Sequence, residues 1–127
     1  MALDAISTPK IIDDARIPFK GQNIWCINGY DTDASTAIEI KAAPGAGKAL
    51  FLTEIIIGSD DADAHPHIQD EDDNVLFGPL LSSTGGMHLV GVLKHPIQLV
   101  ENKALEIKAA AAGNVFVFIQ GATAQVT

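Results

Sequence analysis

The chain has little cysteine and no long hydrophobic run. Cys26 is the only cysteine among 127 residues, which excludes an internal disulfide bond. It lies in the apolar run Ile24-Trp25-Cys26-Ile27, which favours a buried, unreactive thiol. No apolar run approaches the roughly 20 residues of a membrane-spanning helix, and the first ten residues lack the basic-then-apolar pattern of a secretion signal. We therefore expect a soluble protein with no membrane partner that is made and folded in a cytoplasm.

Basic residues are also scarce. The chain has eight Lys and Arg against sixteen Asp and Glu, so its formal net charge at pH 7 is −8. Such an acidic chain repels nucleic-acid phosphates, and its few basic residues are scattered, so we expect no nucleic-acid partner. Hydrophobic residues make up 47% of the chain, which is enough for a packed core. Aromatic residues make up only 6%, so this core should be mainly aliphatic.

Short apolar segments separated by Gly, Pro, Asn and Asp recur along most of the chain. Residues 36–41 and 104–109 alternate apolar and polar side chains, as half-buried antiparallel strands do. Residues 87–93 and 96–100 predict two further strands. Short strands at even spacing predict an all-β fold, a single-domain antiparallel β-sandwich or barrel over residues 21–127 with almost no helix. The predicted core includes Phe51, Ile55, Leu105, Ile107, Val115 and Val117.

Two predicted strands are apolar on both faces. Residues 50–57 carry only one charge, Glu54, and residues 115–119 carry none. A strand of this kind must be covered on both faces. The opposing sheet of a sandwich supplies one cover, and a neighbouring subunit can supply the other. We therefore expect the protein to associate with itself as a homo-oligomer.

Residues 1–20 show no clean period, and Pro9 and Pro18 interrupt them. This pattern suits an extended N-terminal arm that lies on another surface. A first edge strand with a frayed end is the alternative. The apolar residues proposed to anchor the arm on that surface are Ile11, Ile12, Ile17 and Phe19.

His65 and His67 form the sharpest local feature. Residues two apart in a strand share a face, so both imidazoles can reach one metal ion. With Glu71, Gly58 and Gly78 they resemble the first metal-binding motif of the cupins, jelly-roll proteins in which two His and one Glu bind a transition metal. The first glycine-to-histidine spacing is one residue longer here, and the second cupin motif with its third histidine is absent.

A facial metal site with an open position needs that third ligand. We therefore expect no bound metal and no cofactor. A cupin-type metal-binding protein or enzyme that uses His65, His67 and Glu71 stays as one alternative.

The remaining local patterns favour structural roles. Asp70-x-Asp72-x-Asn74 resembles the start of an EF-hand calcium loop but lacks its Gly and distal Glu, so a solvated acidic loop is favoured. Residues 42–48 resemble the end of a phosphate-binding loop, but Ala stands where that motif needs Gly and Ser or Thr. No catalytic triad is recognisable, so we expect no enzyme. In a second alternative, a carbohydrate- or receptor-binding tail module, Trp25 and Tyr30 would stack on the ligand.

Residues 35–124 as a whole resemble a family of tailed-phage structural proteins, the capsid decoration or cement proteins. The resemblance rests on an alternating strand, a Pro-Gly-x-Gly-Lys loop, an Ile-rich strand, an acidic hairpin, a Gly-rich loop, and a Lys-Ala-Leu-x-Ile-Lys strand before the closing Val/Phe strand. It implies a jelly-roll-like sandwich, usually a trimer, with an N-terminal arm. It also implies the major capsid protein as partner and a place on the outer surface of a virion assembled in a bacterial cytoplasm.

Overall fold

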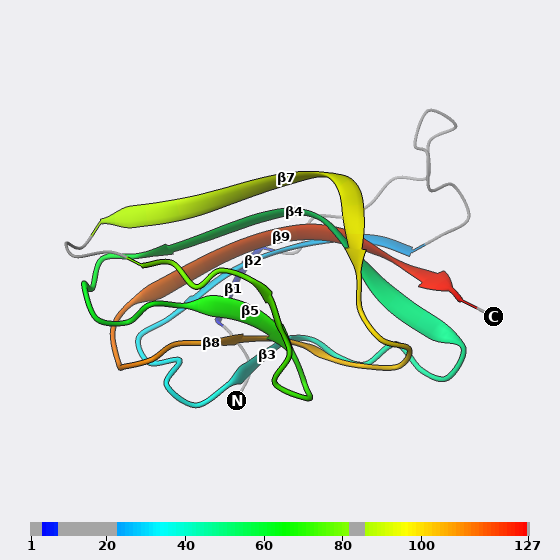
Figure 1. Ribbon diagram of the computed structural model, residues 1–127, viewed down its shortest axis with the longest axis horizontal. Coiled ribbons are helices and arrows are strands. Elements are labelled where there is room, and N and C mark those ends of the chain that lie inside the picture. The colour runs from blue at the N-terminus through cyan, green and yellow to red at the C-terminus, as the bar shows by residue number, and fades with distance from the viewer. Residues whose placement is uncertain (1–3, 8–22, 82–85, 127) are drawn as a thin grey trace.

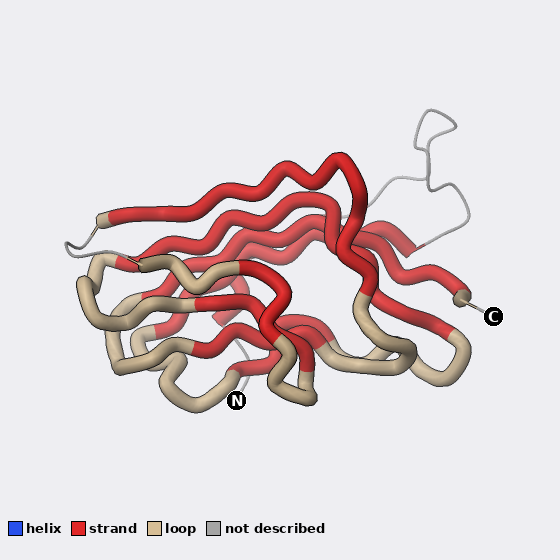
Figure 2. The backbone as a smooth tube through the Cα atoms, in the orientation of Figure 1, coloured by secondary structure: helices blue, strands red, loops and turns tan. Residues whose placement is uncertain are grey.

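The protein folds into two antiparallel sheets (Figures 1 and 2). The structure is a computed structural model that describes residues 4–7, 23–81 and 86–126. Nine strands and no helix occur in these ranges, and the prediction of an all-β fold is confirmed. One sheet has the order β1-β2-β9-β4-β7 and the other the order β3-β8-β5-β6. The strands are β1 (Asp4–Ser7), β2 (Asn23–Asp31), β3 (Ile38–Lys41), β4 (Lys48–Ser59), β5 (His67–Asp70), β6 (Val75–Phe77), β7 (Met87–Gln98), β8 (Leu105–Lys108) and β9 (Val115–Gln125).

The core lies between the two sheets and is mainly aliphatic, as the composition predicts. On the four-stranded sheet, Ile38 pairs with Ile107, which pairs in turn with Ile68. All three side chains are buried, and they pack in one cluster with the inward residues of β4 and β9. Five of the six predicted core residues are fully buried: Ile55, Leu105, Ile107, Val115 and Val117.

Strand β4 changes the face that it buries partway along its length. Leu50 and Leu52 are buried, and so are Ile55 and Ile57, although side chains alternate strictly along a regular strand. A register shift between Leu52 and Glu54 reverses the alternation toward both neighbouring strands. An extra residue in one strand does this, and such a β-bulge also bends the strand.

The bulge corrects the prediction that Phe51 belongs to the core. Phe51 precedes the register shift and alternates with the inward residues Leu50 and Leu52, so it points to the other face and is only partly buried. Its assignment to the core assumed one unbroken alternation from Phe51 to Ile55. The sequence contains no glycine at this point to mark the bulge.

Strand β7 corrects a second prediction. The sequence predicted two separate strands, residues 87–93 and 96–100, but one strand runs without interruption from Met87 to Gln98. Val92 pairs with Glu54 and Ile97 pairs with Leu52, so four residues of β7 lie between two pairs that only Thr53 separates on β4. Figure 1 shows β7 bending sharply in this yellow region. The ring of Phe77 on β6 packs against β7 at Gly91, where an added Cβ would lie 2.6 Å from it.

The predicted N-terminal arm, residues 1–20, is described only at β1. This strand pairs antiparallel with β2 at the edge of the five-stranded sheet, with Ala5 opposite Gly29. The proposed contact residues Ile11, Ile12, Ile17 and Phe19 lie outside the described residues, so the arm stays a prediction. The remaining strands fall within the predicted sandwich domain, residues 21–127.

Replacing Ile107 with alanine should lower the free energy of unfolding by about 2–5 kcal/mol, because it leaves a cavity between the sheets. Ile107 is fully buried, and it lies on β8 between Ile38 of β3 and Ile68 of β5, with which it pairs. Urea unfolding of the purified protein measures the loss. Val75→Ala is the matched control, because Val75 is 54% exposed and should change stability little. Equal stability of both variants would contradict the assigned core.

Candidate functional site

The outer surface of the five-stranded sheet is largely apolar. Along β2, β9, β4 and β7, the residues between the buried positions point away from the opposing sheet. Tyr30 is 49% exposed, Val90 is 50% exposed and Val92 is 76% exposed, and Phe116 is also exposed. We call this surface the apolar face and define it by the outward residues Cys26, Asn28, Tyr30, Glu54, Ile56, His88, Val90, Val92, Phe116, Phe118 and Gln120.

Strand register arranges the apolar face in rows across four strands. Tyr30 lies beside Phe116, which neighbours Gly58 and then His88. In the next row, Asn28 and Phe118 are followed by Ile56 and Val90. An open groove of about 730 Å³ runs over these rows and is lined by residues that include Tyr30, Ile56, His88, Val90 and Phe116. The rows give the apolar face a continuous surface.

The apolar face also contains one polar atom without a partner. The side-chain oxygen of Asn28 is buried, yet it accepts no hydrogen bond from any described residue. A buried acceptor without a donor costs about 1–3 kcal/mol. Asn28 lies between Cys26 and Tyr30 on the outward side of β2. The missing hydrogen bond is therefore located on the same face as the exposed aromatic side chains.

Cys26 lies on this face as well, and it is only partly buried rather than buried as predicted. Partial burial, and secondarily the negative charge of Glu54, raise the pKa of its thiol above the ordinary value. The thiol therefore stays protonated at neutral pH, which makes it a poor nucleophile. The predicted low reactivity thus has an electrostatic cause in addition to burial.

The outer surface of the four-stranded sheet carries a polar network, although Val75 on β6 is also exposed there. Gln69, on β5, is 2% exposed, and its amide nitrogen donates to Asp73 Oδ1 at 3.1 Å and to Glu106 Oε1 at 3.0 Å. Carboxylates only accept hydrogen bonds, so these contacts fix the orientation of the amide. The Gln69 oxygen then faces His67 Nε2 at 2.8 Å, and His67 must donate the hydrogen bond.

This arrangement separates the residues that the cupin motif groups together. His65 and His67 border the same shallow depression, together with Lys108, whose positive charge opposes a metal cation. His67 Nε2 carries a proton toward Gln69, so that nitrogen has no lone pair for a metal. Glu71 points elsewhere and accepts a hydrogen bond from the Ala104 amide at 2.8 Å. Within the described ranges, no cluster of three or more His, Cys, Asp or Glu side chains could hold a metal ion.

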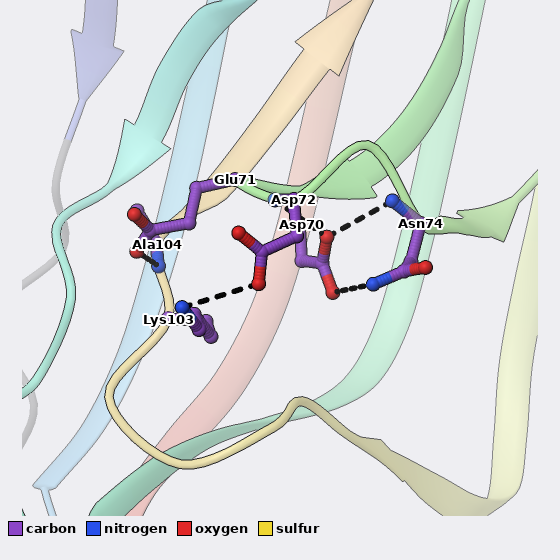
Figure 3. A network of polar contacts seen from close by, with 6 residues as sticks. All are labelled: Asp70, Glu71, Asp72, Asn74, Lys103 and Ala104. Atoms are coloured by element: carbon purple, nitrogen blue, oxygen red, sulfur yellow. Dashed lines mark hydrogen bonds and ion pairs between the residues drawn. The ribbon is translucent and has the colours of Figure 1, made fainter.

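The acidic turn between β5 and β6 is exposed from Glu71 to Asn74, as a solvated loop is, but the buried Asp70 at its start gives it a fixed structure. Asp70 is 2% exposed, and its Oδ1 accepts hydrogen bonds from the amides of Asp72 at 2.9 Å and Asn74 at 3.0 Å. Its Oδ2 accepts one from the Asn74 side chain at 2.9 Å, as Figure 3 shows. A short carboxylate that bonds the following amides is the signature of an Asx turn. The resemblance to a calcium loop therefore has a different cause, because both oxygens of Asp70 hold the turn together.

The same turn anchors the loop that precedes β8. Glu71 exchanges two hydrogen bonds with Ala104, one from each backbone amide. Lys103 forms an ion pair with Asp72 at 3.1 Å (Figure 3). These contacts bring together segments more than 30 residues apart in the sequence. Turn residues that look like a surface loop in the sequence therefore connect β5, β6 and β8.

Two further candidate segments are engaged in internal contacts. In the loop that resembles a phosphate-binding loop, the amide of Gly45 donates to Asn102 Oδ1 and that of Gly47 to Glu101 Oε2, both at 2.9 Å. Trp25, a candidate platform for sugar stacking, is 4% exposed, and its indole nitrogen donates to Thr123 at 3.2 Å. Its ring is therefore not open to a ligand, whereas Tyr30 lies on the apolar face.

Comparison of the chain with protein-family models, with curated proteins and with solved structures finds no match. In the described part of the chain there is no helix of the length and hydrophobicity needed to cross a membrane.

Replacing Asp70 with asparagine should lower the free energy of unfolding at pH 7 by on the order of 2–3 kcal/mol, because the NH2 group that replaces Oδ2 would face the side-chain NH2 group of Asn74. Burial alone would raise the pKa of Asp70, but hydrogen bonds from Asn74 and Asp72 and the charge of Lys103 outweigh it and lower the pKa. The ionised carboxylate thus stabilises the fold above the unfolded-state pKa, about 3.9, and this contribution is lost as the pH falls through the lowered folded-state value.

The difference in stability between the wild type and Asp70→Asn should therefore shrink as the pH is lowered below about 4. Urea unfolding at several pH values measures it. Asp63→Asn is the matched control, since the Asp63 side chain is exposed and should leave the pH profile unchanged. A pH-independent difference would rule out the assigned role of the carboxylate charge.

Proposed function

We propose that this chain is a structural protein of a tailed-phage virion that binds the outer capsid surface and stabilises the shell, as decoration or cement proteins do. In this proposal the protein is not an enzyme, needs no cofactor, and acts as a homo-oligomer, most simply a trimer. Its partners are the major capsid protein and other copies of itself. The resemblance of residues 35–124 to that family motivates the proposal.

The strand order supports the jelly-roll fold that this family implies. If the edge strand β1 is set aside, the four pairs β2–β9, β3–β8, β4–β7 and β5–β6 are all neighbours within a sheet. These pairs are nested in the sequence, so the chain resembles one long antiparallel hairpin that is rolled into two four-stranded sheets. Jelly rolls consist of eight strands in two such sheets. We therefore propose a jelly roll with an extended N-terminal arm as its addition.

The observation that carries the assembly role is the difference between the two outer sheet surfaces. The four-stranded sheet carries a hydrogen-bonded polar network of Gln69, Glu106 and Asp73 on its outside. The five-stranded sheet exposes Tyr30, Val90, Val92 and Phe116. Contiguous exposed apolar surface typically marks an interaction site, whereas single exposed apolar residues do not. A module with one polar and one apolar face suits a building block whose polar face stays in solvent.

The arm has a separate role in this proposal. Its apolar residues supply contacts to the shell or to a neighbouring subunit. An arm that orders on binding adds contact area but loses chain entropy. The apolar side chains must therefore provide most of the gain. They are the residues expected from the sequence, Ile11, Ile12, Ile17 and Phe19.

Full-length protein should co-sediment with empty phage shells that lack it and should raise the temperature at which those shells rupture. A variant with serine at positions 11, 12, 17 and 19 should bind much more weakly while keeping its fold. Substitution is preferable to deletion because residues 4–7 form β1. Leu81→Ser is the control, since this exposed residue is remote from the arm in sequence.

If the wild type neither co-sediments nor delays rupture, the decoration function is wrong. If the wild type and the serine variant bind equally, the role of the arm is wrong and the decoration function stands.

A further inference from the structure

We infer that the apolar face is the surface through which copies of this chain associate, each copy covering the face of another. The inference deepens the proposed function and rests on its homo-oligomeric form, but it does not depend on binding to a capsid. The occupant of the groove over Tyr30, Ile56 and Phe116 is then a second copy of the chain rather than a small ligand.

Charge is the first argument for a second copy. Each chain carries a net charge of −8, so two copies repel each other unless they meet where carboxylates are few. Three paired rows across β2, β9, β4 and β7 contain twelve residues from Cys26–Val92 at one end to Tyr30–His88 at the other. Glu54 is the only Asp, Glu, Lys or Arg among these twelve, and one further carboxylate, Asp60, borders the groove just after the end of β4. The polar sheet, in contrast, presents Glu106, Asp73 and Lys108 around Gln69.

The size of the face is the second argument. Strands β2, β9, β4 and β7 contain 9 to 12 residues. At about 3.3 Å per residue and about 4.8 Å between strands, the whole outer surface of the four strands covers roughly 600 Å², and the three rows of the apolar face, five residues on each strand, cover roughly 320 Å² of it. Stable interfaces bury about 600–1,000 Å² on each partner. The outer surface of these four strands thus reaches the size that a specific protein–protein contact needs, and the apolar face makes up about half of it.

The buried oxygen of Asn28 is the third argument. It belongs to the row that also contains Phe118, Ile56 and Val90, and no described residue donates a hydrogen bond to it. Buried acceptors in proteins nearly always have a donor. A second copy packed on this row can supply one from an outward polar side chain such as Gln120 or the Tyr30 hydroxyl. A purely apolar occupant cannot supply a donor.

The test is the solution mass of three proteins: the wild type, Val90→Glu and Val75→Glu. Val90 and Val75 are 50% and 54% exposed, on the apolar face and on β6 of the other sheet. The two variants therefore carry the same substitution at similar exposure and differ in the sheet on which it lies. We expect wild type and Val75→Glu to elute as the same oligomer. Val90→Glu should weaken association at least about a hundredfold, because it buries an unpaired carboxylate at the contact.

Cys26 provides an independent measurement, because it is the only cysteine of the chain and lies on the same face. Its alkylation by iodoacetamide should slow as wild-type concentration rises, and it should not depend on concentration in Val90→Glu. Circular dichroism confirms that each variant keeps its strand content.

Three results would overturn the inference: a monomeric wild type at high concentration, an oligomer whose mass Val90→Glu leaves unchanged, or Val75→Glu dissociating as readily as Val90→Glu. A monomeric wild type whose Cys26 reacts more slowly than Cys26 of Val90→Glu would assign the face to a segment of the same chain instead. None of these measurements uses phage shells, so failure of this inference is distinguishable from failure of the decoration function.

Discussion

The alternation of side chains along β4 is the constraint on which the rest of the structure depends. This strand lies between β9 and β7, so its register sets which residues of three strands face the core. A strand that buried Leu50 and Leu52 without a bulge would turn Ile55 and Ile57 outward, since one residue of slip moves the whole set to the other face. The bulge at Thr53 lets both pairs contribute to the core. Its hydroxyl donates to the Gln120 carbonyl at 3.0 Å, which satisfies a backbone group at the irregular position.

Local sequence pattern predicted the strands well where one face is buried and the other exposed. Ile38, Leu105 and Ile107 alternate with charged residues, and each of them is buried. The bulge in β4 and the bend in β7 were not predicted, because they arise from pairing between residues that are 38 to 69 positions apart in the sequence. The burial of Phe51 was overestimated for the same reason. Residue type alone does not reveal where the alternation reverses.

For the candidate metal ligands and the acidic turn, too, residue type predicted part of the arrangement, and contacts with residues distant in the sequence determined the rest. The spacing of His65 and His67 did bring both to one depression. The orientation of His67, however, depends on Gln69, which depends on Asp73 and Glu106. None of these partners belongs to the motif. Asp70 and Asn74 carried a readable turn signal, the pattern of an Asx turn, but its acidic neighbours suggested a solvated loop. The short distance between this turn and Ala104 is a property of the fold that no local pattern contains.

The outward aromatic residues of β9 are not a by-product of core formation. Val115, Val117 and Ile119 already fill the inward positions, so polar residues at the alternate positions would leave the core intact. Gln120, an outward residue of the same strand, is an example. Phe116 and Phe118 instead extend a surface that begins at Tyr30 and continues to Ile56 and Val90. Hydrophobic area of this kind lowers the free energy only when something removes it from water. In a chain with sixteen acidic residues, this concentration of neutral side chains on one sheet is best explained by a cover supplied from outside the sheet.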